Sequence, residues 1–361
     1  MADDRVARLR LIRTPTIGPV TWRQLIARFG SAEAAIEALP DLAARGGGRA
    51  PSVAGLATVE REIATVEKLG ARYLFLDDPA YPPALAEIEN APAVMTIKGD
   101  TGLFARTAVA MVGARNASAA ACRFARGLAV ELGRDGVVIV SGLARGLDTA
   151  AHQGSIDTGT IGVIACGIDV VFPPENRALQ AEVAERGLLI AEQPPGTEPL
   201  ARHFPYRNRI IAGLAAGTVV VEAAPKSGSL ITARIAAEAG RDVMAVPGSP
   251  LDPRAQGCNL LIREGATLVQ SAADILEIVR PIDPRMVRAP ALPFDGAPSP
   301  DPDDAGRRMI AGLLGPVPVG VDELIRQSTL PAPVVATILL ELELAGRLDR
   351  HAGARVSLRS S

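Results

Sequence analysis

The chain has 361 residues, of which 48% are hydrophobic and 22% charged, so it is long enough for two or three domains and too apolar to be disordered. Its formal net charge of −2 excludes a protein coated in basic surface, and a site for a polyanion must therefore gather its positive charge in one place. No charge-free apolar run reaches the length of a membrane span, and the first residues lack the form of a signal peptide. We expect a cytoplasmic protein without a membrane span.

The cysteines Cys122, Cys166 and Cys258 lie far apart and show neither disulfide nor metal spacing. We expect free thiols, buried for at least Cys122 and Cys166. No pattern in the sequence predicts a metal or a cofactor.

Residues 1–50 are predicted to form a small helical domain. Apolar side chains share one helical face from Trp22 to Phe29, and Gly30–Ser31 is expected to end this helix and cap the next, Ala32–Leu39. Two helices joined by a glycine-containing turn resemble a helix-hairpin-helix or SAM-like module. Such a turn can donate N–H groups to phosphate, but Pro19 has none to give, which favours a module that only packs.

Residues 58–280 alternate short apolar runs with helical stretches. Strands are predicted at Tyr73–Leu76, Val94–Ile97, Val109–Val112, Val137–Val140, Ile161–Ile164, Leu188–Ala191, Val219–Glu222, Val243–Val246 and Thr267–Val269. Helices are predicted at Thr58–Leu69, Ser118–Leu132, Leu147–Asp157, Glu175–Glu185, Leu230–Ala239 and Ala272–Val279. This alternation predicts an α/β fold with a doubly wound, mostly parallel sheet, in which ligands bind beyond the carboxyl ends of the strands.

The last part of the chain is predicted to hold a proline-rich linker, residues 281–305, and a winged-helix-like domain, residues 306–361. Its three helices are expected at Arg308–Leu314, Val321–Gln327 and Pro333–Ala345, followed by a β-wing. Because Pro331–Ala345 contains no basic residue, protein interaction or support of a dimer is favoured over reading of the major groove.

The stretch Arg202–Gly248 brings cationic and aromatic side chains together in a chain with only 3% aromatic residues. Phe204 and Tyr206 offer flat surfaces for base stacking, although Phe204 could instead fill the core. Arg207 and Arg209 cannot share a helical face, so one is expected to point toward a phosphate and the other to pair with Glu222 or cap a carbonyl.

Three turns at strand ends are candidate phosphate sites. Lys226-Ser227-Gly228-Ser229 opens directly into a helix and offers backbone N–H groups to an anion. Gly113-Ala114-Arg115 and Ser141–Arg145 follow two earlier strands. Arg115 is placed to meet a phosphate or to form a structural ion pair. The turn after Val112 has a single glycine, which excludes the dinucleotide fingerprint.

Asp148 and His152 lie four residues apart on one predicted helical face. They could be a metal or acid–base pair, but a structural hydrogen bond between them is favoured because no third ligand is evident. No Walker A sequence, HExxH motif or Ser–His–Asp order is present, so nothing indicates hydrolytic catalysis.

In this order, the motifs resemble the DNA-processing protein A (DprA/Smf) family. They are Val112–Arg115, Ser141–Asp148 with Ala151-His152, Phe204–Leu214, Val221–Ala223, Lys226–Ala233, Ala245–Gly248 and Gly257–Ile262. Leu147 and Phe172 depart from the family's usual Ile and Tyr.

The resemblance implies an extended Rossmann-like core that binds single-stranded DNA. It also implies a non-catalytic homodimer that protects incoming DNA and loads the recombinase RecA during natural transformation. The residues expected to bind DNA are Gly113, Arg115, Ser141, Gly142, Arg145, Phe204, Arg207, Asn208, Arg209, Lys226, Ser227, Gly228 and Ser229. The alternative is a nucleotide-processing enzyme similar to the lysine-decarboxylase-like phosphoribohydrolases, but Pro247–Pro250 lacks their PGGxGT turn.

Overall fold

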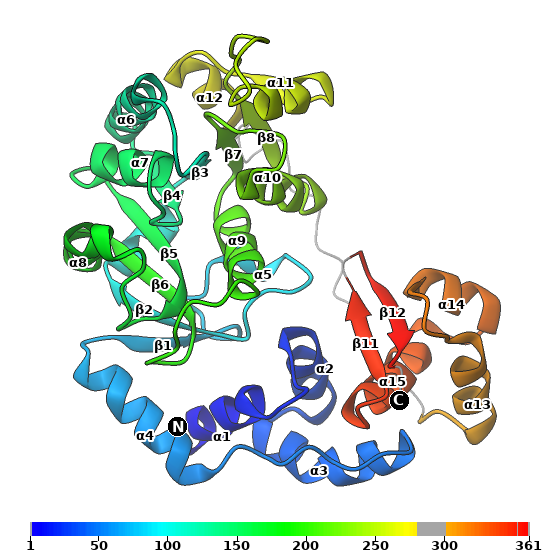
Figure 1. Cartoon of the computed structure of the whole chain (residues 1–361). Helices are drawn as coiled ribbons and strands as arrows, with labels where there is room; N and C mark the ends of the chain where they lie inside the picture. The colour runs from blue at the N-terminus through cyan, green and yellow to red at the C-terminus, as the bar shows by residue number, and fades with distance from the viewer. Residues whose placement is uncertain (1, 280–300, 352, 360–361) are drawn as a thin grey trace, which may run out of the picture. The chain divides into compact units, whose positions relative to one another are not determined.

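The structure is a computed structural model that describes residues 2–279, 301–351 and 353–359. Its chain forms two compact units (Figure 1). One contains the described residues up to 61 together with those from 301 onward, and the other contains residues 62–279. Most of the predicted linker, residues 281–300, lies outside the described residues.

The second unit is built on a nine-stranded sheet with the strand order β1-β2-β6-β5-β4-β3-β7-β8-β9. The strands are β1 (Arg72–Phe75), β2 (Val94–Gly99), β3 (Ala108–Val112), β4 (Val138–Ser141), β5 (Thr160–Gly167), β6 (Leu188–Gln193), β7 (Gly217–Val220), β8 (Asp242–Ala245) and β9 (Thr267–Leu268). β2 runs antiparallel to both of its neighbours, β1 and β6, and all pairs from β6 to β9 are parallel. The predicted mostly parallel sheet is confirmed.

Helices cover both faces of this sheet, as the predicted doubly wound plan requires (Figure 1). One face carries α6 (Ala119–Arg134), α7 (Leu147–Ser155), α8 (Arg177–Arg186) and α12 (Ala272–Val279). The other carries α5 (Pro83–Ala86), α9 (His203–Leu214), α10 (Gly228–Glu238) and α11 (Gln256–Arg263). Two short 3₁₀ helices, η1 (Thr101–Ala105) and η2 (Pro174–Asn176), join strands to helices, and α4 (Leu56–Lys68) leads into β1.

The central strands are apolar without alternation because both of their faces are buried. Every residue of β3 and of β4 is buried, and side chains of β3 enter the apolar cores on both sides of the sheet. The chain passes from β3 to β6 in one direction and then returns to β7 on the other side of β3. The carboxyl ends of seven parallel strands therefore share one edge, with the topological switch point between β3 and β7.

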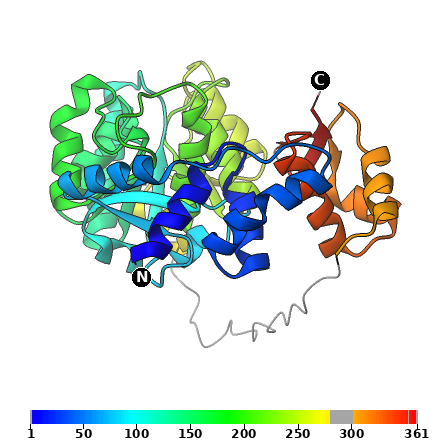
Figure 2. The same ribbon diagram turned by 90° about the horizontal axis from the view of Figure 1, so that it is seen from below.

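The first unit begins with α1 (Ala2–Arg13), α2 (Pro19–Phe29) and α3 (Ala32–Arg45), drawn in blue in Figure 2. As predicted, Gly30 ends α2 in the left-handed region at φ 76°, and Ser31 caps α3 by accepting from the Ala34 N–H. The predicted end of α3 at Leu39 is wrong. The helix continues through Pro40 because Leu42 and Ala43, one turn further, are buried.

The unit ends in the predicted winged helix, whose fold class is confirmed. It consists of α13 (Asp304–Leu313), β10 (Val319–Gly320), α14 (Val321–Ser328), α15 (Ala332–Leu344), β11 (Leu348–His351) and β12 (Arg355–Leu358). The two-residue strand β10 was not predicted, and it pairs with β12 to make a three-stranded sheet with β11.

None of the helices in the described part of the chain combines the length and the apolarity that a bilayer crossing requires. All three cysteines are free thiols, as predicted. The expected burial holds for Cys166, but Cys122 is only half-buried, and Cys258 is the second buried thiol.

Candidate functional site

A pocket of about 340 Å³ opens at the carboxyl edge of the sheet. Each of its walls comes from a different strand end. The lining residues are Arg115, Asn116, Gly142, Ala144, Arg145, Ile164, Ala165, Cys166, Phe172, Pro173, Pro199, Phe204 and Arg207. They come from the last residues of β5, from the loops that follow β3, β4, β5 and β6, and from the first turns of α9. The parallel topology therefore gathers them from positions far apart in the sequence.

The half-buried ring of Phe204 lines the pocket and contacts three other lining residues. The guanidinium carbon of Arg115 lies 5.2 Å from the ring centroid, and that of Arg207 lies 5.9 Å from it. Phe172 meets the same ring edge-on at 6.0 Å. A flat apolar surface flanked by two cations suits a ligand with both aromatic and anionic parts.

The turn after β4 is a rigid wall of the pocket. The buried carboxylate of Asp148 accepts from the N–H groups of Gly142 and Ala144 at 3.1 and 3.2 Å. The side-chain amide of Asn176 donates to the carbonyls of Leu143 and Ala144 at 2.8 and 3.2 Å. Asp148 therefore binds the N–H groups of Gly142 and Ala144, and neither is left for a phosphate.

Gly142 is a glycine because a guanidinium fills the place of its side chain. An added Cβ would lie 1.4 Å from Nη1 of Arg207, which itself donates to the carbonyl of Val163 at 3.1 Å. Arg207 is 7% exposed, and burial lowers the pKa of its guanidinium while the charge of Asp148 opposes that change. Burial raises the pKa of the Asp148 carboxyl, and the Arg207 charge acts against this as well. The two groups thus support each other's charge beneath the pocket.

Arg209 has a structural role in this fold. Its side chain is 3% exposed and pairs with Glu192 at the end of β6, with 2.5 Å between Nη2 and Oε1. The predicted alternative partner, Glu222, instead accepts from the N–H and the hydroxyl of Ser118 at 2.9 and 2.7 Å. Of the two predicted alternatives, pairing of an arginine with Glu222 is wrong, because the N-terminal end of α6 occupies this carboxylate. Bonding to a carbonyl is what Arg207 does at Val163.

Three other predicted residues do not line the pocket. The hydroxyl of buried Ser141 donates to the Met111 carbonyl at 2.6 Å. An added Cβ on Gly113 would lie 2.6 Å from the Leu147 side chain, so this glycine serves the packing of β3 against α7. Asn208 lies in the second turn of α9 and is half-buried, but it does not line the pocket.

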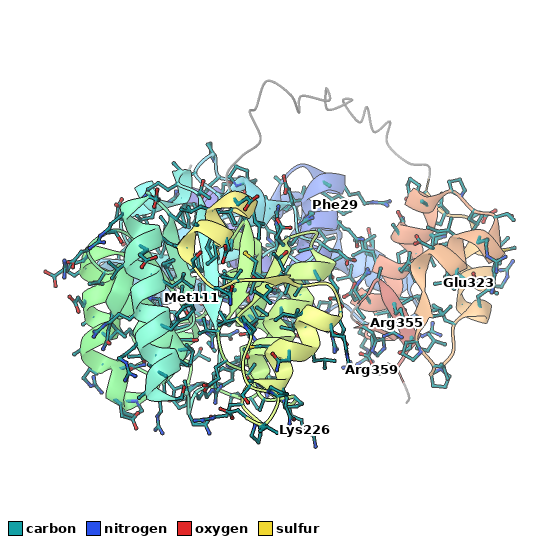
Figure 3. The ribbon with its side chains drawn as sticks, turned by 90° about the horizontal axis from the view of Figure 1, so that it is seen from above. Phe29, Met111, Lys226, Glu323, Arg355 and Arg359 are labelled. Atoms are coloured by element: carbon teal, nitrogen blue, oxygen red, sulfur yellow. The ribbon has the colours of Figure 1, made fainter. Side chains whose placement is uncertain are left out.

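The turn Lys226–Ser229 lies at the same edge of the sheet, after β7, but outside the pocket lining. Lys226 is exposed and projects from the surface (Figure 3). Ser227 caps α10 by accepting from the Ser229 N–H at 3.4 Å, and the two hydroxyls lie 2.7 Å apart. Since β7 is next to β3, this turn neighbours the loop that carries Arg115.

Arg145 lines the pocket at the surface and pairs with Glu175 at 2.5 Å, with both side chains more than half exposed. Such a pair contributes little stability and leaves the arginine free to exchange partners. Asn116, Phe172 and Pro199 line the pocket but were not among the predicted site residues. Phe172 could have been predicted from the sequence, because the chain has only seven phenylalanines and this one follows a predicted strand end.

The favoured hydrogen bond between Asp148 and His152 is wrong. The ring of His152 bonds through Nδ1 to the Thr160 hydroxyl at 2.7 Å, and its Nε2 has no hydrogen-bond partner. Asp148 is directed toward the turn that begins at Gly142. In the described residues no group of three or more His, Cys, Asp or Glu side chains could hold a metal ion.

Cys166 is the only thiol that lines the pocket. Burial raises its pKa to about 12, despite the opposing charge of Arg207. The thiol is therefore protonated at neutral pH and contributes an apolar wall instead of a nucleophile.

Three family models match successive parts of the chain. A model described as DNA recombination-mediator protein A matches residues 72–280. A DprA-like N-terminal HHH domain model matches residues 2–65, and a DprA winged helix domain model matches residues 295–354.

Individual relatives agree with this. DNA processing protein DprA of Streptococcus pneumoniae is 47% identical over 206 residues, 56% of this chain and 72% of that protein. Protein Smf of Escherichia coli is 36% identical over 307 residues, 84% of this chain and 81% of that protein. The structure of the S. pneumoniae protein matches with a TM-score of 0.65 at 36% identity, covering 77% of this chain and 98% of that one.

A second solved structure is DNA processing protein A from Helicobacter pylori, described for its single-stranded DNA binding mode. It matches with a TM-score of 0.52 at 28% identity and covers 57% of this chain and 94% of that one.

The buried imidazole of His152 predicts acid sensitivity. Burial, reinforced by the Arg207 charge, lowers its pKa to about 3, whereas an unfolded histidine titrates near 6.5. Below about pH 6.5 the unfolded chain binds a proton that the folded chain does not, so stability present above that pH is lost as the pH falls toward 3. Between pH 6.5 and pH 4, His152 should lower the free energy of unfolding by about 3 kcal/mol.

The measurement is urea unfolding at several pH values for the wild type and for His152→Asn. The variant's stability should fall less over this range, by about that amount. Parallel curves for the two proteins would contradict the assignment, since every other titrating group is the same in both.

Proposed function

Because the chain belongs to the DNA recombination-mediator protein A family, we propose that it binds single-stranded DNA without sequence specificity at the carboxyl edge of its sheet. The observation that carries this proposal is the ring of Phe204, whose centroid lies 5.2 Å from the guanidinium carbon of Arg115 and 5.9 Å from that of Arg207. An unpaired base can stack on such a ring, and cations beside it can neutralise the phosphates on either side. The H. pylori relative, whose structure is described by its single-stranded DNA binding mode, supports the same ligand.

The proposed path of the strand follows the row of turns along this edge. It starts in the pocket, crosses the ends of β4 and β3, and reaches the Lys226–Ser229 turn after β7. Three strand spacings separate β5 from β7, or about 14 Å at ~4.8 Å per strand. Arg115, Arg145 and Lys226 are the exposed cations on this path, with Arg207 beneath it.

The proposed role is to protect incoming single strands and to load RecA on them as a homodimer. The description of the matching family as a recombination mediator supports this role. We also propose that the protein acts without catalysis. In support, the pocket's one thiol is protonated at neutral pH, and its buried acid, Asp148, is used to hold the turn that begins at Gly142.

The alternative function is a phosphoribohydrolase-like enzyme acting on nucleoside monophosphates, since a pocket of this size would also admit a nucleotide. The two functions are separated by one experiment. Incubation with each nucleoside monophosphate should release no free base, and a monophosphate should compete poorly with an oligonucleotide for binding.

Removal of the exposed cations should weaken binding of a labelled poly-dT strand. Each phosphate contact on a single strand contributes about 0.7 to the slope of log K against log salt. We expect Arg115→Ala and Lys226→Ala each to lower affinity and to reduce that slope by about 0.7. Fluorescence anisotropy at two or more salt concentrations measures both quantities.

The matched control is Arg186→Ala, because Arg186 is at the C-terminal end of α8, at the opposite edge of the sheet. It should leave affinity and slope unchanged. Phe204→Leu keeps an apolar side chain but removes the flat ring, and it should lose roughly 1–3 kcal/mol of binding. Equal affinity for all four variants and the wild type would refute the proposed site.

Gly142→Ala should weaken binding although it adds only a methyl group. The new Cβ would overlap the Arg207 guanidinium and displace it from beneath Phe204. Gly127→Ala is the control, because Gly127 is an exposed glycine in α6 with no atom within 4 Å of its added Cβ. Affinity for poly-dT and thermal melting are measured together. Loss of affinity in both variants, or in neither, would show that the position of Arg207 does not govern binding.

The RecA step has a separate test. Nucleation of RecA on single strands coated with single-strand-binding protein should accelerate when the wild type is added, and Arg115→Ala should reduce that acceleration as it reduces binding. Tight DNA binding with no effect on RecA would remove the loading role and leave the binding proposal intact.

A further inference from the structure

The third helix of the winged helix, α15 (Ala332–Leu344), is buried on two opposite sides. One side packs in the core of its own module through Val335, Ile338 and Leu342. The opposite side carries Thr337, Leu340, Glu341 and Leu344, which are also buried, although only the first side belongs to that core. A helix buried on two opposite sides requires a second partner element.

That partner is the C-terminal end of α3, at the other end of the sequence. Gly46, which follows α3, packs so closely that an added Cβ would lie 2.0 Å from the Glu341 carbonyl oxygen. An added Cβ on Gly48 would lie 2.4 Å from the Ala345 carbonyl oxygen. Gly46 has φ −73°, which any residue can adopt, so the glycine is required by space and not by backbone conformation.

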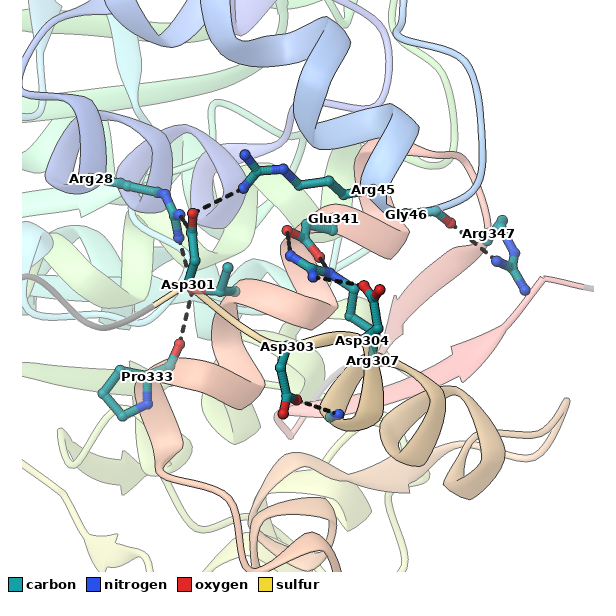
Figure 4. A network of polar contacts seen from close by, with 12 residues as sticks. Arg28, Arg45, Gly46, Asp301, Asp303, Asp304, Arg307, Pro333, Glu341 and Arg347 are labelled. Carbon is teal, nitrogen blue, oxygen red and sulfur yellow. Dashed lines mark hydrogen bonds and ion pairs between the residues drawn. The ribbon is translucent and has the colours of Figure 1, made fainter.

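Polar contacts surround this close approach (Figure 4). Arg28 of α2 donates to the Thr337 hydroxyl at 3.0 Å and also pairs with Asp301. Arg45 of α3 pairs with Asp301 as well, at 3.2 Å. On the other side, Arg347 donates to the Gly46 carbonyl at 3.1 Å.

An ion pair within the winged helix holds α15 against α13. The Glu341 side chain is 1% exposed and accepts from Nε and Nη2 of Arg307 at 2.8 and 2.9 Å. Arg307 belongs to α13, so this bidentate pair holds α13 and α15 at a fixed rotation. The backbone carbonyl of the same residue, Glu341, is the atom that lies against Gly46.

We infer that α15 is a docking surface for the N-terminal helical domain of the same chain, which fastens the two end domains into one body. In helix-turn-helix folds the corresponding helix enters the major groove of duplex DNA. Here it carries two glutamates and no basic residue over Ala332–Leu344, and the face opposite its own core is covered by α3. The winged helix therefore binds the N-terminal domain of its own chain and does not bind the major groove of duplex DNA through α15.

The test separates the domains covalently and asks whether they stay together. A specific protease site replaces residues 286–292 of the full chain, and the purified protein is cut. Size-exclusion chromatography at low micromolar concentration should recover the C-terminal fragment with the rest of the protein. Gly46→Ala should release it, with retention weakened on the order of tenfold or more, because overpacking against a backbone oxygen cannot relax by rotamer change.

Gly312→Ala is the matched control, since Gly312 lies in α13 with nothing within 4 Å of an added Cβ, and it should leave retention unchanged. Asp301→Ala is a second variant that should fold normally, because the Asp301 side chain is 55% exposed. It should weaken retention, most clearly at low salt, where the ion pairs with Arg28 and Arg45 are least screened. Circular dichroism confirms the folding of each variant.

Two results would overturn the inference. The first is release of the C-terminal fragment from the cut wild-type protein at low micromolar concentration. The second is full retention in both Gly46→Ala and Asp301→Ala, which would place the attachment elsewhere than between α3 and α15.

Discussion

The buried guanidinium of Arg207 is the constraint on which the candidate site depends. Its charge is kept in the interior by the nearby carboxylate of Asp148, and its position requires a glycine at 142. Asp148 holds the turn that begins at Gly142, and Arg207 in turn lies beside the ring of Phe204. Removing one partner would leave an uncompensated charge in a dry interior, which typically costs several kcal/mol. The site is therefore preorganised by the same groups that stabilise this edge of the core.

Charge compensation explains how a chain with a net charge of −2 can present a cationic edge. Some acidic side chains neutralise buried arginines, as Glu192 does for Arg209. Others accept hydrogen bonds from the backbone, as Glu222 does from the Ser118 N–H. Among the residues that the structure describes, no buried acid pairs with the exposed cations Arg115 and Lys226, and Arg145 has only a surface partner, Glu175. A chain whose net charge is close to zero can thus have a local positive potential where the parallel strands end.

The sequence predicts the strands, the helices and the edge at which the site lies, because hydrophobic periodicity and strand order follow local rules. It does not predict which cations remain available. In the sequence, Arg209 cannot be told apart from Arg207, and only the fold shows that Glu192 at the end of β6 pairs with it. The spacing of Asp148 suggests His152 as its partner, but in the fold Asp148 binds the turn that begins at Gly142. Phe172 joins Phe204 only through tertiary packing of two loops. Side-chain partners are set by long-range geometry, which local patterns do not contain.

The arrangement also bears on how the protein would distinguish single strands from duplexes. The ring of Phe204 is half-buried, with Phe172 and Arg115 beside it, so a base can reach it only by leaving its own stack. A single strand does this at little cost, whereas a duplex must first unpair and unstack, at a few kcal/mol for each base. With α15 docked against α3, the helix that would otherwise enter a major groove is covered. Selectivity for single strands then follows from what the fold leaves exposed, namely a recessed ring and its neighbouring cations.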